Sequence, residues 1–129
     1  VAYAGIGLSP DLGACATLPR LLGIRRALDL ALSNRAMGAA EALAAGLVTR
    51  VVPDGDVERE AEELATRLAS GPTLAYAAMK RLMREGDSRS FENQLREEAL
   101  SIVRLAASSD AREGIAAFLE KRKPGFHGR

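Results

Sequence analysis

The residues best suited to chemistry lie in one short stretch, residues 6–13, which reads Ile-Gly-Leu-Ser-Pro-Asp-Leu-Gly. Pro10 fixes its own φ angle and pushes Ser9 toward an extended conformation. Asp11 follows where a helix could begin, and its carboxylate could accept a backbone N–H there. Gly13 lets a ligand approach the backbone closely. The stretch therefore predicts a strand end, a turn and a helix N-terminus, with one carboxylate beside a site that favours negative charge.

Asp11 has two interpretations. As an N-cap it would stabilise the following helix by about 1 kcal/mol and do nothing more. As a general acid or base it would be partly removed from water by its apolar neighbours Leu8, Pro10 and Leu12, an environment that suits proton transfer. The sequence pattern alone favours the cap and leaves the second interpretation open.

Other reactive side chains offer less. Cys15 would need a base to act as a nucleophile, and the only histidine is His127 in the tail. We therefore interpret Cys15 as a small buried residue and His127 as solvated. No Cys and His spacing suits a metal ion, so no metal site is predicted. The basic residues at 80–81 and 121–123 could hold phosphates, but the pattern favours solvated helix faces, with the helix dipole explaining the second group.

The composition excludes several classes of partner. Of 129 residues, 47% are hydrophobic and 27% charged, which is typical of one globular domain. The net charge of +1 gives no reason to expect a nucleic acid or membrane partner. A single cysteine allows no internal disulfide and suggests a reducing, cytoplasmic setting. Because the chain opens at Val1 inside an apolar segment, we expect it to be the later part of a longer protein.

Hydrophobic periodicity predicts a mainly α chain with two short strands. The strands are expected at residues 1–8 and 47–52, where the residues are apolar or β-branched and turn residues follow. Helices are expected at residues 12–22, 24–34, 39–45, 57–70, 72–86 and 91–106, followed by a last helix that starts near residue 110. Asp110 and Glu113 have the spacing of a capping box. The tail, residues 125–129, is expected to be loose.

Four segments, taken together, resemble the crotonase family, the enoyl-CoA hydratases and isomerases. They are residues 6–13, 18–23 (Leu-Pro-Arg-Leu-x-Gly), 40–53 and 110–124. The match is to the C-terminal half of a family member. It implies an α/β superhelix of strand-strand-helix turns, of which residues 1–53 would form the end and residues 54–129 the helical oligomerisation region. It also implies a homo-trimer or hexamer whose oxyanion-hole N–H donors and most coenzyme A contacts belong to the other half.

The resemblance also constrains the reaction. Hydratases of the family use two glutamates. One belongs to the other half of the protein, and the position of the second falls on Tyr3, which is not a carboxylate. The Pro10-Asp11 pair instead resembles the isomerase-like branch that includes epoxyphenylacetyl-CoA isomerase. In that branch an aspartate at the position of Asp11 moves the proton, and a thioester enolate is the intermediate. Ala14 replaces the second glycine that usually follows in the family, which would narrow the pocket.

The same comparison implies which residues bind substrate. Leu12 and Gly13 would line the substrate pocket, while Phe118 and Lys121 match positions that touch the adenine and phosphate of a neighbouring subunit's coenzyme A. Coenzyme A would be part of the acyl-CoA substrate, and no separate cofactor is expected. Two alternatives remain open: a family member that has lost catalysis and serves as a binding or assembly subunit, and a small helical interaction domain.

Overall fold

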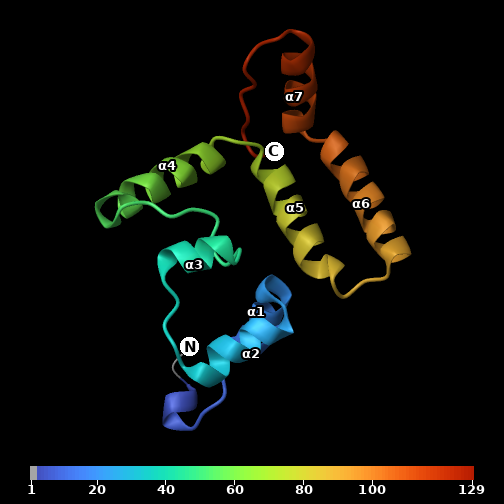
Figure 1. The fold of residues 1–129 in the computed structure, drawn as a ribbon. Helices are drawn as coiled ribbons and strands as arrows, with labels where there is room; N and C mark the ends of the chain where they lie inside the picture. The colour runs from blue at the N-terminus through green and yellow to red at the C-terminus, as the bar shows by residue number, and fades with distance from the viewer. Residues whose placement is uncertain (1–2) are drawn as a thin grey trace. The chain divides into compact units, whose positions relative to one another are not determined.

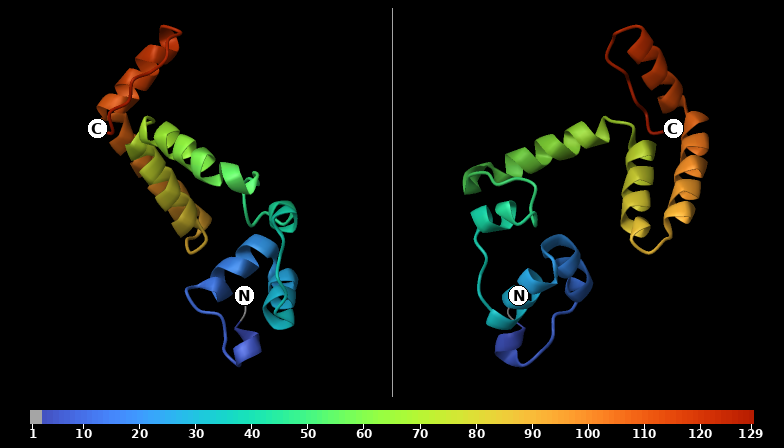
Figure 2. Two further views of the ribbon diagram at one scale, coloured as in Figure 1. Left: turned by 90° about the vertical axis from the view of Figure 1, so that its left-hand side faces the viewer. Right: turned by 45° about the vertical axis from the view of Figure 1, so that its right-hand side comes forward.

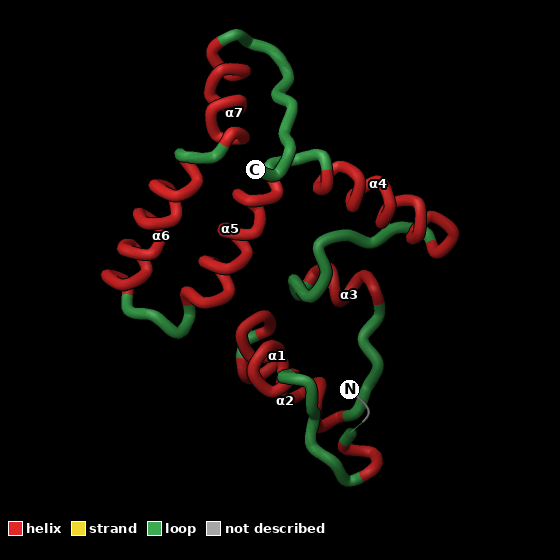
Figure 3. Tube along the Cα trace, turned by 180° about the vertical axis from the view of Figure 1, so that it is seen from behind, coloured by secondary structure: helices red, strands yellow, loops and turns green. Residues whose placement is uncertain are grey.

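Helices make up nearly all the regular structure of this chain. The computed structural model describes residues 3–129, and none of these residues lies in a strand (Figure 3). The prediction of a mainly α chain is confirmed. Contacts divide the described residues into two units, one ending at Gly55 and one beginning at Asp56, and each unit is treated by itself below.

The first unit is built on a pair of helices (Figure 1). A 3-10 turn η1 (Ala4–Ile6) precedes α1 (Ala14–Leu22) and α2 (Ile24–Ser33), and α3 (Ala39–Ala44) follows them. Helices α1 and α2 pack together and bury Leu22, Ala27 and Leu30. Gly23 alone separates the two helices with a φ of 74°, a left-handed value that glycine adopts without strain. Because α1 packs on this small core, the start of α1 and the turn before it have a fixed position within the unit.

The two predicted strands are not found in the described residues. Residues 4–6 form η1, closed by hydrogen bonds from the N–H groups of Ile6 and Leu8 to the carbonyl oxygen of Tyr3 at 3.1 and 3.0 Å. Residues 47–52 are irregular. A β-branched segment becomes a strand only where a neighbour pairs its backbone groups, and no described segment does so. Residues 1 and 2 of the first prediction lie outside the described part of the chain.

The second unit contains four helices. After the 3-10 turn η2 (Asp54–Asp56) come α4 (Val57–Ala69), α5 (Thr73–Gly86), α6 (Phe91–Ala106) and α7 (Ser109–Leu119). Helices α5 and α6 form an antiparallel hairpin, and α7 continues from the end of α6 (Figures 1 and 2). Arg81 of α5 reaches Glu97 of α6 at 3.4 Å. As predicted, Ser90 caps α6, because its hydroxyl oxygen accepts from the N–H of Asn93 at 3.3 Å.

The predicted start of the last helix is wrong in one respect. Ser108 is the N-cap of α7, since its hydroxyl oxygen accepts from the N–H of Ala111 at 3.0 Å. Asp110 lies inside the first turn and directs its carboxylate to the N–H groups of His127 and Gly128 in the tail. The tail is therefore held by hydrogen bonds and is not the loose segment that the sequence suggests.

The apolar faces of the helices follow the predicted spacing but stay largely uncovered in each unit. On α6, Phe91 is 73% exposed, and Leu95 and Ile102 are exposed as well. On α4, Val57, Leu64 and Leu68 are also exposed. Periodicity therefore predicted which residues share a face, while the burial of those faces needs surfaces that residues 3–129 do not supply within either unit. In the described part of the chain, no helix combines the length and the apolar character needed to cross a membrane.

Candidate functional site

Asp11 lies just before the first turn of α1 and does not cap it. Gly13 occupies the N-cap position with a φ of 79°, and α1 begins at Ala14. The carbonyl oxygen of Asp11 accepts from the N–H of Ala14 at 2.9 Å, so the backbone of Asp11, and not its side chain, closes the turn. The favoured capping interpretation of Asp11 is therefore wrong, and its carboxylate is available for another role.

The carboxylate of Asp11 is bound by Tyr3. The Tyr3 hydroxyl donates to Oδ1 of Asp11 at 2.5 Å. This hydrogen bond, and secondly the negative charge of Asp11, raises the pKa of the Tyr3 hydroxyl above its usual value. Within residues 3–129 the second oxygen, Oδ2, has no hydrogen-bond partner. Asp11 is exposed and not desolvated as the proton-transfer hypothesis supposed, so its chemistry would depend on orientation and on what covers it.

Leu12 has an unusual backbone for a leucine. Its φ is 50°, in the left-handed region that residues with a Cβ atom seldom adopt, and the residue is 97% exposed. The exposed side chain contributes almost no burial to offset this strain. Such outliers collect where a ligand or a partner fixes the backbone. Together with Gly13 at a φ of 79°, Leu12 turns the chain sharply from Asp11 into α1.

Cys15 is exposed, contrary to the prediction that it is buried. Helix α1 buries its far end at Leu22 but leaves its first turn open, and Cys15 Sγ contacts the carbonyl oxygen of Pro10 at 3.7 Å. An apolar groove of about 250 Å³ runs between α1 and α2 from this point, with Leu18 and Leu28 in its walls. The groove thus begins at Pro10, the residue before Asp11. In the sequence, only the apolar periodicity of α2 indicated that a surface of this kind lies there.

The second candidate region is the C-terminal end of α7. Phe118 is 82% exposed, and Lys121 follows the helix with a φ of 54°. The N–H of Lys121 donates to the carbonyl oxygen of Phe118 at 3.3 Å and that of Arg122 to Ala117 at 3.0 Å, the two hydrogen bonds of a Schellman motif. Lys121 therefore holds the left-handed position that glycine normally fills. As at Leu12, this backbone strain is typical of a position where a ligand or a partner fixes the chain.

The three basic residues at 121–123 differ in their contacts with carboxylates. Arg122 donates to both carboxylate oxygens of Glu113, at 2.5 and 2.9 Å, and to Glu120 at 2.6 Å. The bond from Arg122, followed by one from the N–H of Gly125, lowers the pKa of Glu113 to about 2. Among the described residues, Lys121 and Lys123 form no ion pair. Of the three cations, Arg122 therefore has a structural role, and the two lysines are available to an anionic ligand.

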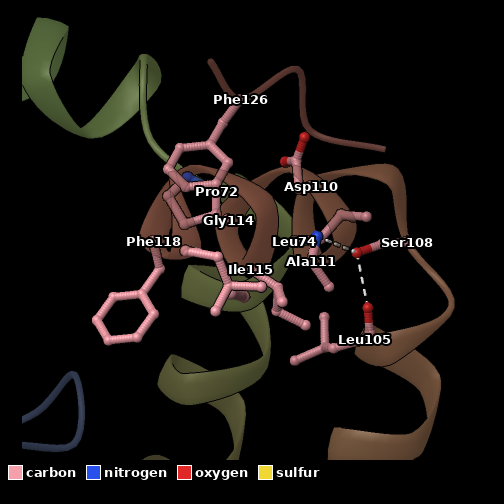
Figure 4. Close-up of a pocket in the computed structure, with 12 residues that line it drawn as sticks. Pro72, Leu74, Leu105, Ser108, Asp110, Ala111, Gly114, Ile115, Phe118 and Phe126 are labelled. Atoms are coloured by element: carbon pink, nitrogen blue, oxygen red, sulfur yellow. Dashed lines mark hydrogen bonds between the residues drawn. The ribbon is translucent and has the colours of Figure 1, made fainter. Parts of the chain in front are cut away.

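An apolar groove of about 430 Å³ runs beside α7 (Figure 4). Its walls come from the start of α5, the end of α6, α7 and the tail, and include Pro72, Leu74, Leu105, Ile115, Phe118 and Phe126. Asp110, at the start of α7, and Phe118, near its end, both border it. The described residues contain no cluster of three or more side chains able to hold a metal ion.

The five predicted site residues form two local groups. Asp11, Leu12 and Gly13 are consecutive at the start of α1, and Phe118 and Lys121 lie one turn apart at the end of α7. Sequence reasoning missed the hydrogen bond from Tyr3 to Asp11, although it identified both positions. It also missed Asp110 as the anchor of the tail, for which the sequence carried no signal beyond an acidic residue in a first turn.

Comparison with known proteins gives the family. Residues 2–129 match the family described as enoyl-CoA hydratase/isomerase. A probable enoyl-CoA hydratase of Rhodobacter capsulatus is 44% identical over 128 residues, 99% of this chain and 50% of that protein. The 1,2-epoxyphenylacetyl-CoA isomerase of Escherichia coli is 37% identical over 130 residues, 100% of this chain and 49% of that protein.

Solved structures agree. A crystal structure from Mycobacterium abscessus, described as an enoyl-CoA hydratase/isomerase, superposes with a TM-score of 0.96 at 40% identity and covers 100% of this chain and 50% of that one. The chain thus spans about half the length of the relatives it matches. The helical arrangement described above is that of solved family members, and the chain belongs to the enoyl-CoA hydratase/isomerase family, whose members include the crotonases.

Proposed function

We propose that this chain is part of an enzyme that acts on acyl-CoA thioesters and that Asp11 moves the substrate proton. The observation that carries the proposal is the carboxylate of Asp11, which the Tyr3 hydroxyl holds through Oδ1 at 2.5 Å and whose Oδ2 has no hydrogen-bond partner within residues 3–129. A positioned carboxylate can take a proton from C2 of the acyl chain while the electron pair moves onto the thioester oxygen. Preorganised N–H donors in the other half of the complete protein would stabilise that enolate.

The reaction type that fits best is isomerisation. Tyr3 stands where the resemblance places a second acid, and its hydroxyl, with a raised pKa, donates a hydrogen bond and does not serve as a base. One carboxylate suffices to remove a proton from C2 of a 3-enoyl thioester and return it to C4, which leaves a 2-enoyl thioester. Addition of water by the glutamate pair of the family would need an acid at the position of Tyr3, which this chain does not offer. The similarity to the E. coli isomerase is consistent with this choice.

Phe118 and Lys121 are proposed to bind coenzyme A across a subunit boundary. Phe118 is 82% exposed, enough for its ring to stack on an adenine ring, and Lys121 presents a cation three residues further on. In this proposal the complete protein is a cytoplasmic trimer or hexamer. Residues 1–53 close its ββα superhelix, and residues 54–129 form its helical oligomerisation region. Coenzyme A belongs to the substrate, and no further cofactor takes part.

The experiment that tests the proposal follows protons in the complete protein. A 3-enoyl-CoA is incubated in deuterated buffer, and both double-bond migration and deuterium at C2 and C4 are measured by NMR. Wild type should do both, Asp11→Asn should do neither at a comparable rate, and Asp54→Asn, an exposed control in the same unit, should behave as wild type. Binding of coenzyme A by a wild-type protein that shows no exchange would instead support a binding or assembly subunit without catalysis.

A further inference from the structure

The carboxylate of Asp110 is buried and fully engaged by the tail. The residue is only 4% exposed. Its Oδ1 accepts from the N–H of His127 at 2.8 Å, and its Oδ2 accepts from the N–H of Gly128 at 2.9 Å. The N–H of Asp110 donates to the carbonyl oxygen of Arg129 at 3.0 Å, and the hydroxyl of Ser109 donates to the same oxygen. Hydrogen bonds to a charged carboxylate are stronger than those between neutral groups, so the first turn of α7 holds residues 127–129 firmly.

The tail is also attached further along α7. The N–H of Gly125 donates to Oε1 of Glu113 at 2.9 Å. The ring of Phe126 lies over Gly114, where a Cβ atom would sit 3.5 Å from the ring edge, an ordinary contact distance. Residues 125–129, which we call the strap, therefore run back along α7 from its end to its start.

The strap reaches α5 as well. Gly128 has a φ of 73°, and a Cβ atom on it would lie 2.6 Å from Oγ1 of Thr73 in the first turn of α5. A residue with a side chain would be strained by the backbone angle and would collide with that hydroxyl. Gly128 thus allows the strap to lie between the start of α7 and the start of α5.

Hydrophobic packing does little to hold α7 in place within its unit. Ala117, at 1% exposure, is its one buried apolar side chain, while Ile115, Phe118 and Leu119 are exposed. A helix that buries one small side chain gains little free energy from packing. Its orientation must then depend on polar contacts, and three of the five hydrogen bonds between the strap and α7 involve Asp110.

We propose that Asp110 is a positioning residue for coenzyme A binding: through the strap it fixes the direction of α7 and so places Phe118 and Lys121. The inference rests on the proposed function, which assigns these two residues to the ligand. Asp110 itself touches no ligand in this proposal. Its loss should lower the fraction of molecules in which the end of α7 is correctly placed, and the apparent Kd rises by the inverse of that fraction.

The test compares Asp110→Asn, Gly128→Ala and a deletion of residues 125–129 in the complete protein, with Glu92→Gln on α6 as a control. An asparagine offers one acceptor oxygen where two N–H groups need one each, and Gly128→Ala attacks the strap from its other side. Calorimetry gives the Kd of free coenzyme A, and hydrogen exchange reports the amides of residues 117–128. Circular dichroism at matched temperature shows which variants fold. If Asp110→Asn does not fold, the Kd of Gly128→Ala decides the proposal.

In Asp110→Asn and Gly128→Ala we expect the amides of residues 127 and 128 to exchange faster. In all three variants we expect the Kd to rise by about tenfold, which corresponds to correct placement in a tenth of the molecules. The kcat at saturating substrate should stay within about twofold of wild type, because bound substrate selects the placed state. Faster exchange with an unchanged Kd, while Lys121→Ala still weakens binding, would overturn the strap proposal alone. An unchanged Kd in Lys121→Ala would overturn the coenzyme A assignment, and the strap proposal with it.

Discussion

The hydroxyl of Tyr3 donates to Oδ1 of Asp11 at 2.5 Å, across the turn between η1 and α1. This bond fixes one oxygen of the carboxylate, while Oδ2 has no hydrogen-bond partner among residues 3–129. The family resemblance places an acid at the position of Tyr3, so the substitution turns a pair of possible bases into one base and one hydrogen-bond donor. The pair therefore suits the transfer of one proton between two carbon atoms better than the activation of a water molecule.

Asp11→Asn in the complete enzyme is expected to lower kcat by roughly a hundredfold to ten-thousandfold, since an amide cannot carry the proton. The free energy of unfolding should hardly change, because Asp11 is exposed and Gly13, not Asp11, is the N-cap of α1. Steady-state kinetics and solvent deuterium incorporation at C2 measure the first effect, and urea unfolding measures the second. If turnover and exchange survive in this variant, the proton carrier must be sought elsewhere in the protein.

Tyr3 should report the charge of Asp11 through its own titration. The hydrogen bond to Asp11, then the negative charge of Asp11, raises the pKa of the Tyr3 hydroxyl above 10.0. Asp11→Asn removes that charge, so Tyr3 should ionise at lower pH in the variant than in the parent. Ultraviolet absorbance of tyrosinate follows the change, in residues 1–129 carrying Tyr76→Phe, which removes the other tyrosine of this stretch. Identical titrations in the two proteins would mean that the pair does not form in solution.

Tyr3→Phe separates orientation from proton transfer. The variant keeps the base and loses one hydrogen bond, whose net free energy is about 1 kcal/mol, so kcat should fall by at most about tenfold. A loss as large as that of Asp11→Asn would show that the hydroxyl takes part in the chemistry itself.

Helices were the predictable part of this fold. Their spacing, the Ser90 cap and the glycines at their ends are local signals, and each predicted helix is found. The strands at 1–8 and 47–52 were not predictable in the same way, because a strand depends on a neighbour for its backbone hydrogen bonds. Apolar faces such as that of α6 illustrate the same limit, since sequence spacing defines a face but not the surface that covers it.

The candidate site divides along similar lines. Asp11 could be identified because a proline, a carboxylate and a glycine stand together in apolar sequence. Its role as a cap was predicted wrongly, since two more residues in the turn move the N-cap from Asp11 to Gly13 and the helix start to Ala14. Asp110 looked like a capping residue because its real partners, the N–H groups of His127 and Gly128, are distant in sequence and belong to the backbone, which carries no residue-specific signal.

Lys121→Gly should stabilise the protein and weaken ligand binding at once. Glycine relieves the left-handed φ of 54°, which should raise the free energy of unfolding by up to about 1 kcal/mol. Loss of the ammonium group should raise the Kd of coenzyme A by about tenfold. The Kd of a coenzyme A analogue without the 3′-phosphate should rise less. Lys123→Gly is the matched control. If Lys121→Gly weakens the binding of both ligands equally, or if the two lysine variants weaken binding equally, a general effect of surface charge is favoured.

Glu113→Gln should alter stability in acid. Since Arg122, then the N–H of Gly125, lowers the pKa of Glu113 to about 2 in the folded protein, the carboxylate contributes stability above its unfolded pKa of 4.5. That contribution is lost as the pH falls from 4.5 to about 2, where Glu113 is half protonated in the folded state. The variant should therefore be less stable than wild type at neutral pH, and the difference should shrink over this window. Urea unfolding at several pH values, with Glu92→Gln as control, measures it; a constant difference would contradict the assignment.

Residues 1–129 on their own are expected to turn over enoyl-CoA substrates far more slowly than the complete protein. The chain spans about half the length of its relatives, and the family resemblance places both oxyanion-hole donors in the other half. Exposed apolar side chains such as Leu12, Phe91 and Phe118 should also make the isolated chain associate or bind a hydrophobic dye, which light scattering and dye fluorescence detect.

Loss of even one oxyanion-hole donor typically costs about a hundredfold to a thousandfold in rate. Assays of the isolated chain and the complete protein at equal molar concentration, with a 2-enoyl-CoA and a 3-enoyl-CoA, compare their turnover. Comparable rates would mean that these residues contain a complete oxyanion site, and the proposed division of labour between the two halves would be wrong.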